Sequence, residues 1–138
     1  MTNEALPRTA RLNAIDMTWF NDDMVGAERG SILKYSGARI VALSSAVNDI
    51  PAGILGREKI TGDGRTQVPV FIDGIYDCYV LSESAVTVGQ GLMISGANVL
   101  SGAAAGDALL GRIIGKALEP VDAGVPTTIQ VMINGAGN

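Results

Sequence analysis

The chain contains two copies of one strand-rich unit, and this internal duplication limits the folds open to it. Three blocks of the first copy return in the second: YSGARIV as ISGANVL, ILGR as IIGK, and TQVPVFIDG as TTIQVMING. The first two blocks return at one spacing, and the third slips by two residues across a turn-rich stretch. Turns tolerate insertions better than strands do. The pattern predicts half-repeats over residues 30–74 and 91–135.

The duplicated unit reads as short strands separated by glycine-rich turns. A tight hairpin signal, Ser36-Gly37-Ala38, lies between apolar runs at residues 31–35 and 39–43, and further runs follow at residues 54–60 and 66–72. Pro69 lies inside the last of these and favours an edge strand or a bulge. We therefore expect an all-β domain over residues 30–138, a small β-barrel or sandwich with an internal duplication. Aromatic residues make up only 4% of the 138 residues, so aliphatic side chains must fill the core.

The first 29 residues duplicate nothing later in the chain. They hold the single tryptophan, Trp19, beside Phe20. A helix over residues 8–20 would contain several weak helix formers, which favours an extended N-terminal arm instead. Two roles are open for the aromatic pair: it plugs one end of the barrel core, or it anchors the arm to a partner, since aromatic side chains dominate interface hot spots.

The composition speaks against catalysis and against nucleic-acid binding. There is no histidine, which removes the commonest general base and metal ligand. The one cysteine, Cys78, is expected to be a small buried hydrophobe. A net charge of −4 does not suit a protein that tracks phosphates. We expect no enzyme activity, no cofactor and no metal. With neither a signal peptide nor a membrane span evident, we expect a soluble protein made in a cytoplasm.

Three short motifs could suggest chemistry, but each is better explained by structure. Gly62-Asp63-Gly64 lacks the other ligands of a calcium loop and is typical of a turn. Gly89-Gln90-Gly91 lacks the third glycine of a dinucleotide fingerprint. Asp73 and Asp77 would share a strand face but stand too far apart for paired acid–base work.

The duplicated core resembles the capsid cement, or head decoration, proteins of tailed bacteriophages. Their halves repeat a plan of glycine, apolar strand, Ser-Gly, apolar strand, small-residue loop, Ile-Gly and strand. The matching segments of this chain are GSILKYSG (30–37) and AGILG (52–56) in the first half, and VTVGQGLMISG (86–96) and LGRIIGKAL (110–118) in the second. The resemblance covers residues 30–134 and leaves the arm outside it.

The resemblance implies a virion protein on the capsid exterior, made in the host cytoplasm, that braces major capsid protein subunits and is often a homotrimer. We expect the arm to be the main attachment segment, because it combines apolar side chains with arginines able to pair with carboxylates. Its candidate partner-binding residues are Arg8, Arg11, Leu12, Ile15, Met17, Trp19 and Phe20. The alternatives are a phage tail or fibre component, or a non-enzymatic cytoplasmic ligand-binding β-barrel. Membranes and nucleic acids are not expected partners.

Overall fold

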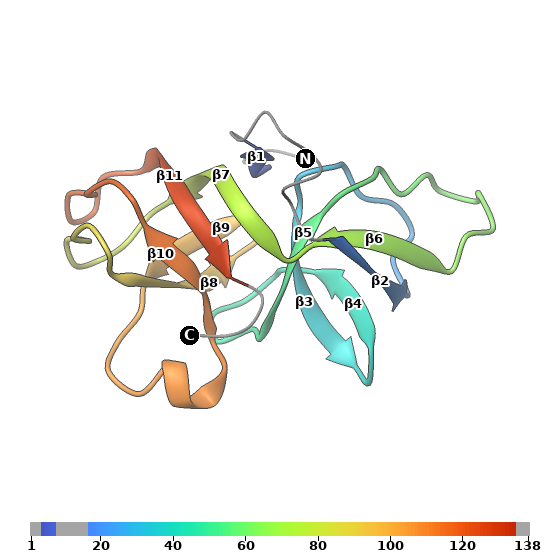
Figure 1. The fold of residues 1–138 in the computed structure, drawn as a ribbon, viewed down its shortest axis with the longest axis horizontal. Coiled ribbons are helices and arrows are strands. Elements are labelled where there is room, and N and C mark those ends of the chain that lie inside the picture. The colour runs from blue at the N-terminus through green and yellow to red at the C-terminus, as the bar shows by residue number, and fades with distance from the viewer. Residues whose placement is uncertain (1–3, 8–16, 135–138) are drawn as a thin grey trace.

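The computed structural model describes residues 4–7 and 17–134, which form two lobes of β-strands side by side (Figure 1). Each half of the chain builds one lobe. The described residues contain strands and one short 3-10 turn, η2 (Ala108–Leu110), so the all-β expectation is confirmed. The expected β-barrel with an internal duplication is present as a closed barrel in the first lobe and a second sheet of the same strand order in the second.

The first lobe is a closed barrel of five strands. Its order is β2-β4-β3-β5-β6, and β2 pairs with β6 to close it. The pairing of β2 with β4 is parallel, while the others are antiparallel. The strands are β2 (Met17–Asp22), β3 (Ile32–Gly37), β4 (Ile40–Leu43), β5 (Pro51–Leu55) and β6 (Gln67–Phe71).

The second lobe repeats this topology strand for strand. A parallel bridge between Val80 and Leu100 joins β9 back to β7, which completes the same circuit of five strands. A sixth strand, β1 (Leu6–Pro7), adds to β7 from outside. The strands of the circuit are β7 (Asp73–Val80), β8 (Gly91–Gly96), β9 (Val99–Gly102), β10 (Ile113–Ala117) and β11 (Thr127–Asn134).

The structural repeat begins earlier than the sequence blocks indicated. β2 in the first barrel corresponds to β7 in the second. Each pairs antiparallel with the last strand of its half, β6 or β11, and each pairs in parallel with β4 or β9. Met17–Asp22 is therefore a barrel strand. This corrects the arm boundary at residue 29 and the domain start at residue 30: the first repeat starts at Met17, and the second at β7.

The strand registers also move the insertion. Leu33 pairs with Gly53, and its counterpart Leu92 pairs with Gly115. Gly53 thus matches Gly115, which differs from the ILGR–IIGK alignment. The second half gains three residues before this strand, in the loop 103–112 that replaces the loop 44–50. Sequence similarity between short apolar runs concealed this shift.

These matched glycines occupy the same bulge in each barrel, where the register shifts. A Cβ atom on Gly53 would lie 2.5 Å from the carbonyl oxygen of Phe71, and one on Gly115 would meet the carbonyl oxygen of Met132 still more closely. Gly53 also has a φ of 145°, which favours glycine. Only a residue without a side chain lets the two strands approach here.

Replacing Gly115 with alanine is expected to lower the free energy of unfolding by about 2–4 kcal/mol, because the new methyl group would push β10 off β11. Chemical denaturation measures the loss. Gly96→Ala is the matched control, since its Cβ would have no neighbour nearer than 3.8 Å. Equal stability of the two variants would contradict the tight approach of the strands.

The two barrel interiors match position by position. Eight side chains fill the first: Phe20, Ala27, Leu33, Val41, Ala52, Leu55, Val68 and Val70. The eight counterparts defined by the strand pairings are all buried in the second: Cys78, Val86, Leu92, Leu100, Ile114, Ala117, Ile129 and Val131. Cys78 occupies the position of Phe20, so the buried cysteine fills a core position that is repeated in both barrels.

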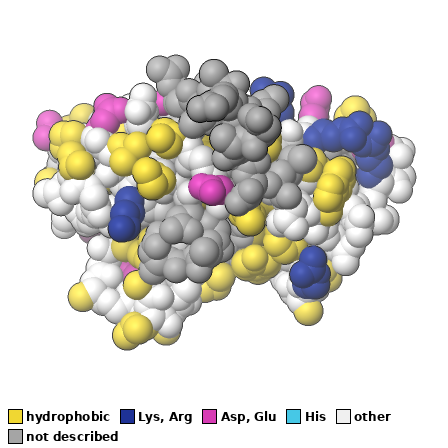
Figure 2. Space-filling view, in the orientation of Figure 1, with side chains coloured by type: hydrophobic (Ala, Val, Ile, Leu, Met, Phe, Trp, Pro, Cys, Tyr) yellow, Lys and Arg dark blue, Asp and Glu magenta, His cyan; other side chains and the backbone are white. Residues whose placement is uncertain are grey.

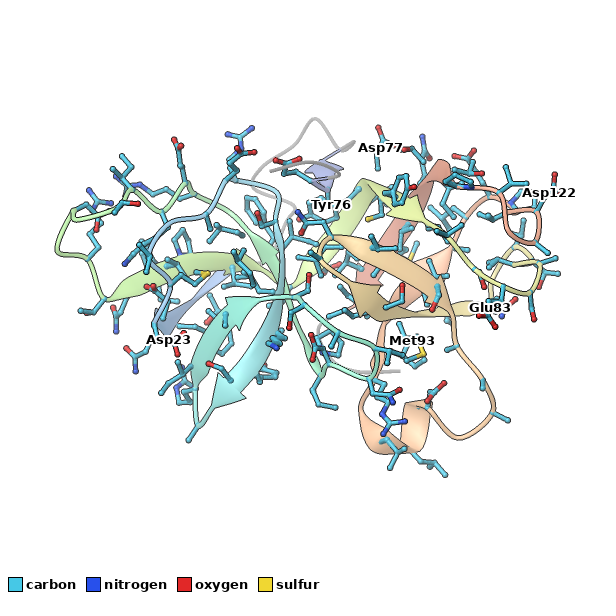
Figure 3. The ribbon with its side chains drawn as sticks, turned by 180° about the vertical axis from the view of Figure 1, so that it is seen from behind. Asp23, Tyr76, Asp77, Glu83, Met93 and Asp122 are labelled. Carbon is cyan, nitrogen blue, oxygen red and sulfur yellow. The ribbon has the colours of Figure 1, made fainter. Side chains whose placement is uncertain are left out.

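The two barrels form one continuous body. A single residue, Ile72, connects β6 to β7. Ile32 and Ile54 of the first barrel are buried in the same apolar cluster as the core of the second. Tyr76, beside β1 near this junction (Figure 3), is fully buried, with its ring centroid 6.1 Å from that of Phe71. The tight connection and the shared apolar contact oppose hinge motion between the barrels.

Hydrogen bonds of a buried asparagine reinforce this junction. The turn between β8 and β9 carries Asn98, which is 1% exposed and has a φ of 57°. Its side-chain oxygen accepts a hydrogen bond of 2.8 Å from the backbone N–H of Ile32, and its own N–H donates to the hydroxyl of Ser44 at 3.0 Å. The corresponding turn of the first barrel carries Arg39, which is exposed. The hairpin turn of the second half therefore contacts the other barrel, whereas the residue at the corresponding position in the first half is exposed.

The proline in β6 does not make that strand an edge. β6 pairs with both β2 and β5, and Pro69 lies opposite Trp19. The carbonyl oxygen of Pro69 accepts a hydrogen bond from Gly56, beyond the end of β5 at Leu55. The nitrogen and carbonyl of one strand residue face the same side. The missing N–H of Pro69 therefore faces Gly56, where the pairing of β5 with β6 has already ended.

Candidate interaction surfaces

The structure separates the predicted attachment residues into different environments. Arg8, Arg11, Leu12 and Ile15 lie outside the described residues. Met17 begins β2, and Trp19 follows in the same strand with 48% of its surface exposed. Of the predicted attachment residues, Trp19 has a side chain that the structure describes as exposed on the barrel surface.

Phe20 is a core residue, which corrects its assignment as a partner-binding residue. It is 9% exposed and belongs to the interior of the first barrel. Its ring packs edge-on against Tyr35 at a centroid distance of 5.7 Å, and the Arg39 guanidinium lies 5.5 Å above it. Strand alternation gives the reason, because neighbouring side chains face opposite sides of the sheet, Phe20 inward and Trp19 outward.

A buried ion pair lies at one end of the first barrel. Asp22 and Lys59 have side chains that are 1% and 7% exposed, with Nζ 3.2 Å from the nearer carboxylate oxygen. Asp22 also accepts a hydrogen bond from the backbone N–H of Met24, and Lys59 donates to the carbonyl oxygen of Arg65. A second carboxylate, that of Asp63, lies 3.9 Å from the ammonium group. Lys59 is therefore held by several acceptors, as a structural group rather than a reactive amine.

The second barrel has valines where the first has this ion pair. Asp22 corresponds to Val80, because each forms the parallel bridge to the second strand of the hairpin in its barrel, β4 or β9. Lys59 corresponds to Val121, since each forms the equivalent isolated bridge, to Ala27 and to Val86. Both valines are buried. The duplication thus presents one site in a charged and an apolar version.

Asp63 is a turn residue, as the sequence predicted for Gly62-Asp63-Gly64. Its carboxylate accepts a hydrogen bond from the backbone N–H of Arg65 at 2.8 Å. This bond, together with the positive charges of Lys59 and Arg65, holds the pKa of Asp63 below its usual value. Within the described residues no group of three or more acidic, cysteine or histidine side chains could hold a metal ion.

Two buried titratable groups of the second barrel, the Cys78 thiol and the Tyr76 hydroxyl, are held in their neutral forms. Burial, with a smaller contribution from Asp77, raises the pKa of the Cys78 thiol to about 12. Burial also raises the pKa of Tyr76, whose hydroxyl donates to the carbonyl oxygen of Asp73 at 2.8 Å. A thiol in this state is a poor nucleophile.

Two surface hollows of about 640 Å³ each lie among the described residues. One lies where the barrels meet and contains Glu83, four serines and two exposed apolar side chains, Val47 and Leu81. The other is on the first barrel and contains Glu28 and Glu58 beside the buried Lys59. Each hollow thus combines carboxylate charge with exposed apolar side chains, Val47 and Leu81 in one and Val25 and Ile60 in the other.

The described part of the chain has no helix with the length and apolar character needed to cross a membrane. Charged and apolar side chains are interspersed over the face seen in Figure 2. Apolar side chains lie over η2 at the lower left edge of that view (Figures 1 and 2).

Comparison with known proteins finds a similar fold but assigns the chain to no family. No protein-family description and no curated protein matches the sequence. Among solved structures, the chain is similar to the head fiber gp8.5 N base of bacteriophage phi29, with a TM-score of 0.51 and 17% sequence identity. The match covers 87% of this chain and 94% of that one. The similarity therefore extends over both barrels.

Proposed function

We propose that the protein is a structural component of a bacteriophage virion that binds the outside of the head as a cement or decoration protein. The observation that carries this proposal is the fold shared with a head fiber base over nearly all of both chains. The glycine and apolar pattern of the sequence supports the same class independently. In this role the protein is made in the host cytoplasm and has no catalytic function, cofactor or nucleic-acid partner.

The architecture suits a protein that works by rigidity. Two closed rings leave few free strand edges, and the junction of Ile32, Ile54 and Asn98 fixes one ring to the other. A protein that binds only an assembled shell stabilises that shell by mass action. Many copies on one shell hold it together even when each contact is modest.

The proposed partners are the major capsid protein and further copies of this chain, as a homotrimer on the shell. The proposed attachment residues are those that the sequence indicated, without Phe20: Arg8, Arg11, Leu12, Ile15, Met17 and Trp19. Trp19 supports this assignment because an aromatic ring half-exposed on a rigid strand contributes contact area with little loss of conformational freedom.

A second candidate function is the base of a fibre that projects from the head. The specific observation in its favour is that the similar structure is itself the base of a head fiber. A fibre base also binds the shell, but it presents a further chain and has no need to strengthen contacts between shell subunits.

The purified protein is expected to bind heads of the phage that encodes it when those heads have been assembled without it. Co-sedimentation measures the binding, and electron microscopy of decorated heads measures stoichiometry and position. A cement protein should raise the temperature at which the shell opens, whereas a fibre base should leave it unchanged. Heads that take up no protein at any concentration would rule out both candidates.

A further inference from the structure

The outer edge of β2 corresponds to an edge that is covered in the second barrel. On β7, Tyr76 and Asp77 pair with the two residues of β1, so an extended segment lies along that edge. The alignment of β2 with β7 places Trp19 at the position of Asp77. β2 pairs with β4 only from Asn21 onward. Beside Trp19, the described residues therefore leave uncovered the edge that β1 covers on β7.

The main chain of Trp19 is directed toward this open edge. In a strand, the N–H and carbonyl of one residue face the same side, and successive residues alternate. Asn21, two residues after Trp19, donates its N–H to the carbonyl oxygen of Arg39 at 3.2 Å, on the side of β4. Opposite Trp19, Pro69 has its carbonyl bonded to Gly56, away from β2. Both observations place the N–H and carbonyl of Trp19 on the open side, where a further strand can pair with them.

A cation flanks the open edge. Arg39, whose carbonyl accepts the bond from Asn21, is exposed, with its guanidinium 5.5 Å from the centroid of the Phe20 ring. No ion pair of the described residues includes Arg39. The corresponding residue of the second barrel, Asn98, is buried against the first barrel. A segment that pairs with β2 at Trp19 therefore reaches a positive charge that a carboxylate would match.

A second copy of this chain is a poor occupant of the edge. The first barrel contacts the second through Ile32 and Ile54, which pair with each other and lie in the shared apolar cluster. A copy that repeated this junction end to end would place Gly91 and Lys116 at those positions, because they pair in the same way. Lys116 is exposed and charged, so the apolar contact would be lost. Each copy has one N-terminal strand, and that strand covers its own β7.

We infer that an extended acidic segment of a capsid-shell subunit adds as a strand to β2 at Trp19, with a carboxylate beside Arg39. This inference rests on the proposed function and specifies how the shell is bound. Main-chain hydrogen bonds supply affinity in strand addition, and side chains at alternate positions supply specificity. The pairing of β1 with β7 shows that this edge of the fold accepts a short extended segment. The Trp19 ring, which is 48% exposed, adds apolar contact area.

Hydrogen exchange at single-residue resolution tests the strand directly, on the natural full-length protein free and bound to heads assembled without it. The Trp19 amide should exchange rapidly in the free protein, because it faces the open edge. On heads it should exchange about tenfold more slowly or slower still. The Thr18 and Phe20 amides face β6 and should be protected in both states. A Trp19 amide that stays unprotected on heads would overturn the strand addition.

Three variants separate the ring, the main chain and the charge in binding to heads. Trp19→Ala removes only the ring and should bind about thirtyfold more weakly than the natural chain. Trp19→Pro also removes the N–H of the open edge while it leaves the ladder with β6 intact, and should bind about tenfold more weakly than Trp19→Ala. Arg39→Asp reverses the charge in a residue type that tolerates the φ of 56°, and should bind about tenfold more weakly than the natural chain. The matched control is Arg57→Asp, because Arg57 is exposed and follows β5, which does not pair with β2. The control should bind like the natural chain.

The outcomes distinguish this inference from the proposed function. If the natural chain binds heads, but Trp19→Pro binds like Trp19→Ala and Arg39→Asp like the natural chain, the strand addition is wrong and the proposed function stands. If the natural chain binds no heads, both fail. If the Trp19 amide becomes protected without heads, together with self-association in sedimentation, the occupant is a second copy and the shell assignment is overturned. Should Trp19→Pro unfold, Arg39→Asp and exchange in the natural chain decide the matter.

Discussion

A chain that begins at Gly30 is expected to lose the first barrel rather than to yield a compact core without its arm. The deletion removes β2, which pairs with β6 on one side and with β4 on the other. It also removes Phe20 from the interior. Loss of a buried aromatic side chain alone costs about 3–5 kcal/mol. Loss of the whole strand should exceed the stability that the remaining four strands can supply.

Hydrogen exchange measures this result directly. Amides of β3, β4, β5 and β6 should lose protection in the deleted chain. A chain that begins at Met17 is the matched control: it keeps β2 and loses β1 and Ala5, so the first barrel should stay protected. Full protection of the first barrel in the shorter chain would show that the barrel folds without residues 1–29, as the sequence alone suggested.

Replacing Lys59 with valine is expected to destabilise the protein by about 3–5 kcal/mol, because it leaves the Asp22 carboxylate buried without its cation. Replacing Asp22 with valine as well should recover most of that loss. The double variant copies the Val80–Val121 arrangement of the second barrel, and a buried ion pair can often be exchanged for apolar side chains at little cost.

Denaturant unfolding of the two single variants and the double variant measures the coupling between the residues. The control is Lys34→Val: Lys34 forms an ion pair with Asp49 at 3.5 Å, but its side chain is 24% exposed, so the loss should be about 1 kcal/mol or less. Additive losses for Lys59→Val and Asp22→Val would contradict a buried, mutually dependent pair.

The sequence predicted the fold class and the duplication because both are expressed in local signals. Glycine turns and alternating apolar residues mark strands wherever they occur. The sequence could not show that β2 corresponds to β7, since Phe20 and Cys78 occupy equivalent core positions with no chemical likeness. It also misplaced one strand, expected at residues 54–60 and found at Pro51–Leu55. Gly53, at the bulge there, gives no signal beyond being one of many glycines.

The candidate surfaces were less predictable than the fold. Trp19 and Phe20 are adjacent and similar in sequence, and the direction of each depends on strand register, which only the pairing with β6 sets. The turn η2 gives no distinct signal in the sequence, because the insertion that contains it is visible only once Gly53 and Gly115 are aligned. The same alignment places Lys59 opposite Val121. Asp22 falls opposite Val80 only through the correspondence of β2 with β7, so the exchange of the pair was not visible in the sequence.

The pairing of first with last strands sets the order in which the growing chain can fold. The first barrel cannot close until Phe71 has been synthesised, because β6 is the partner of β2. At that moment Ile32 and Ile54 face water, and the N–H of Ile32 has no Asn98 to accept its hydrogen bond. An unmatched polar group and an uncovered apolar face make a nascent chain prone to aggregate. The newly made first barrel is therefore most vulnerable during translation of the second half, until β8 and β9 cover it.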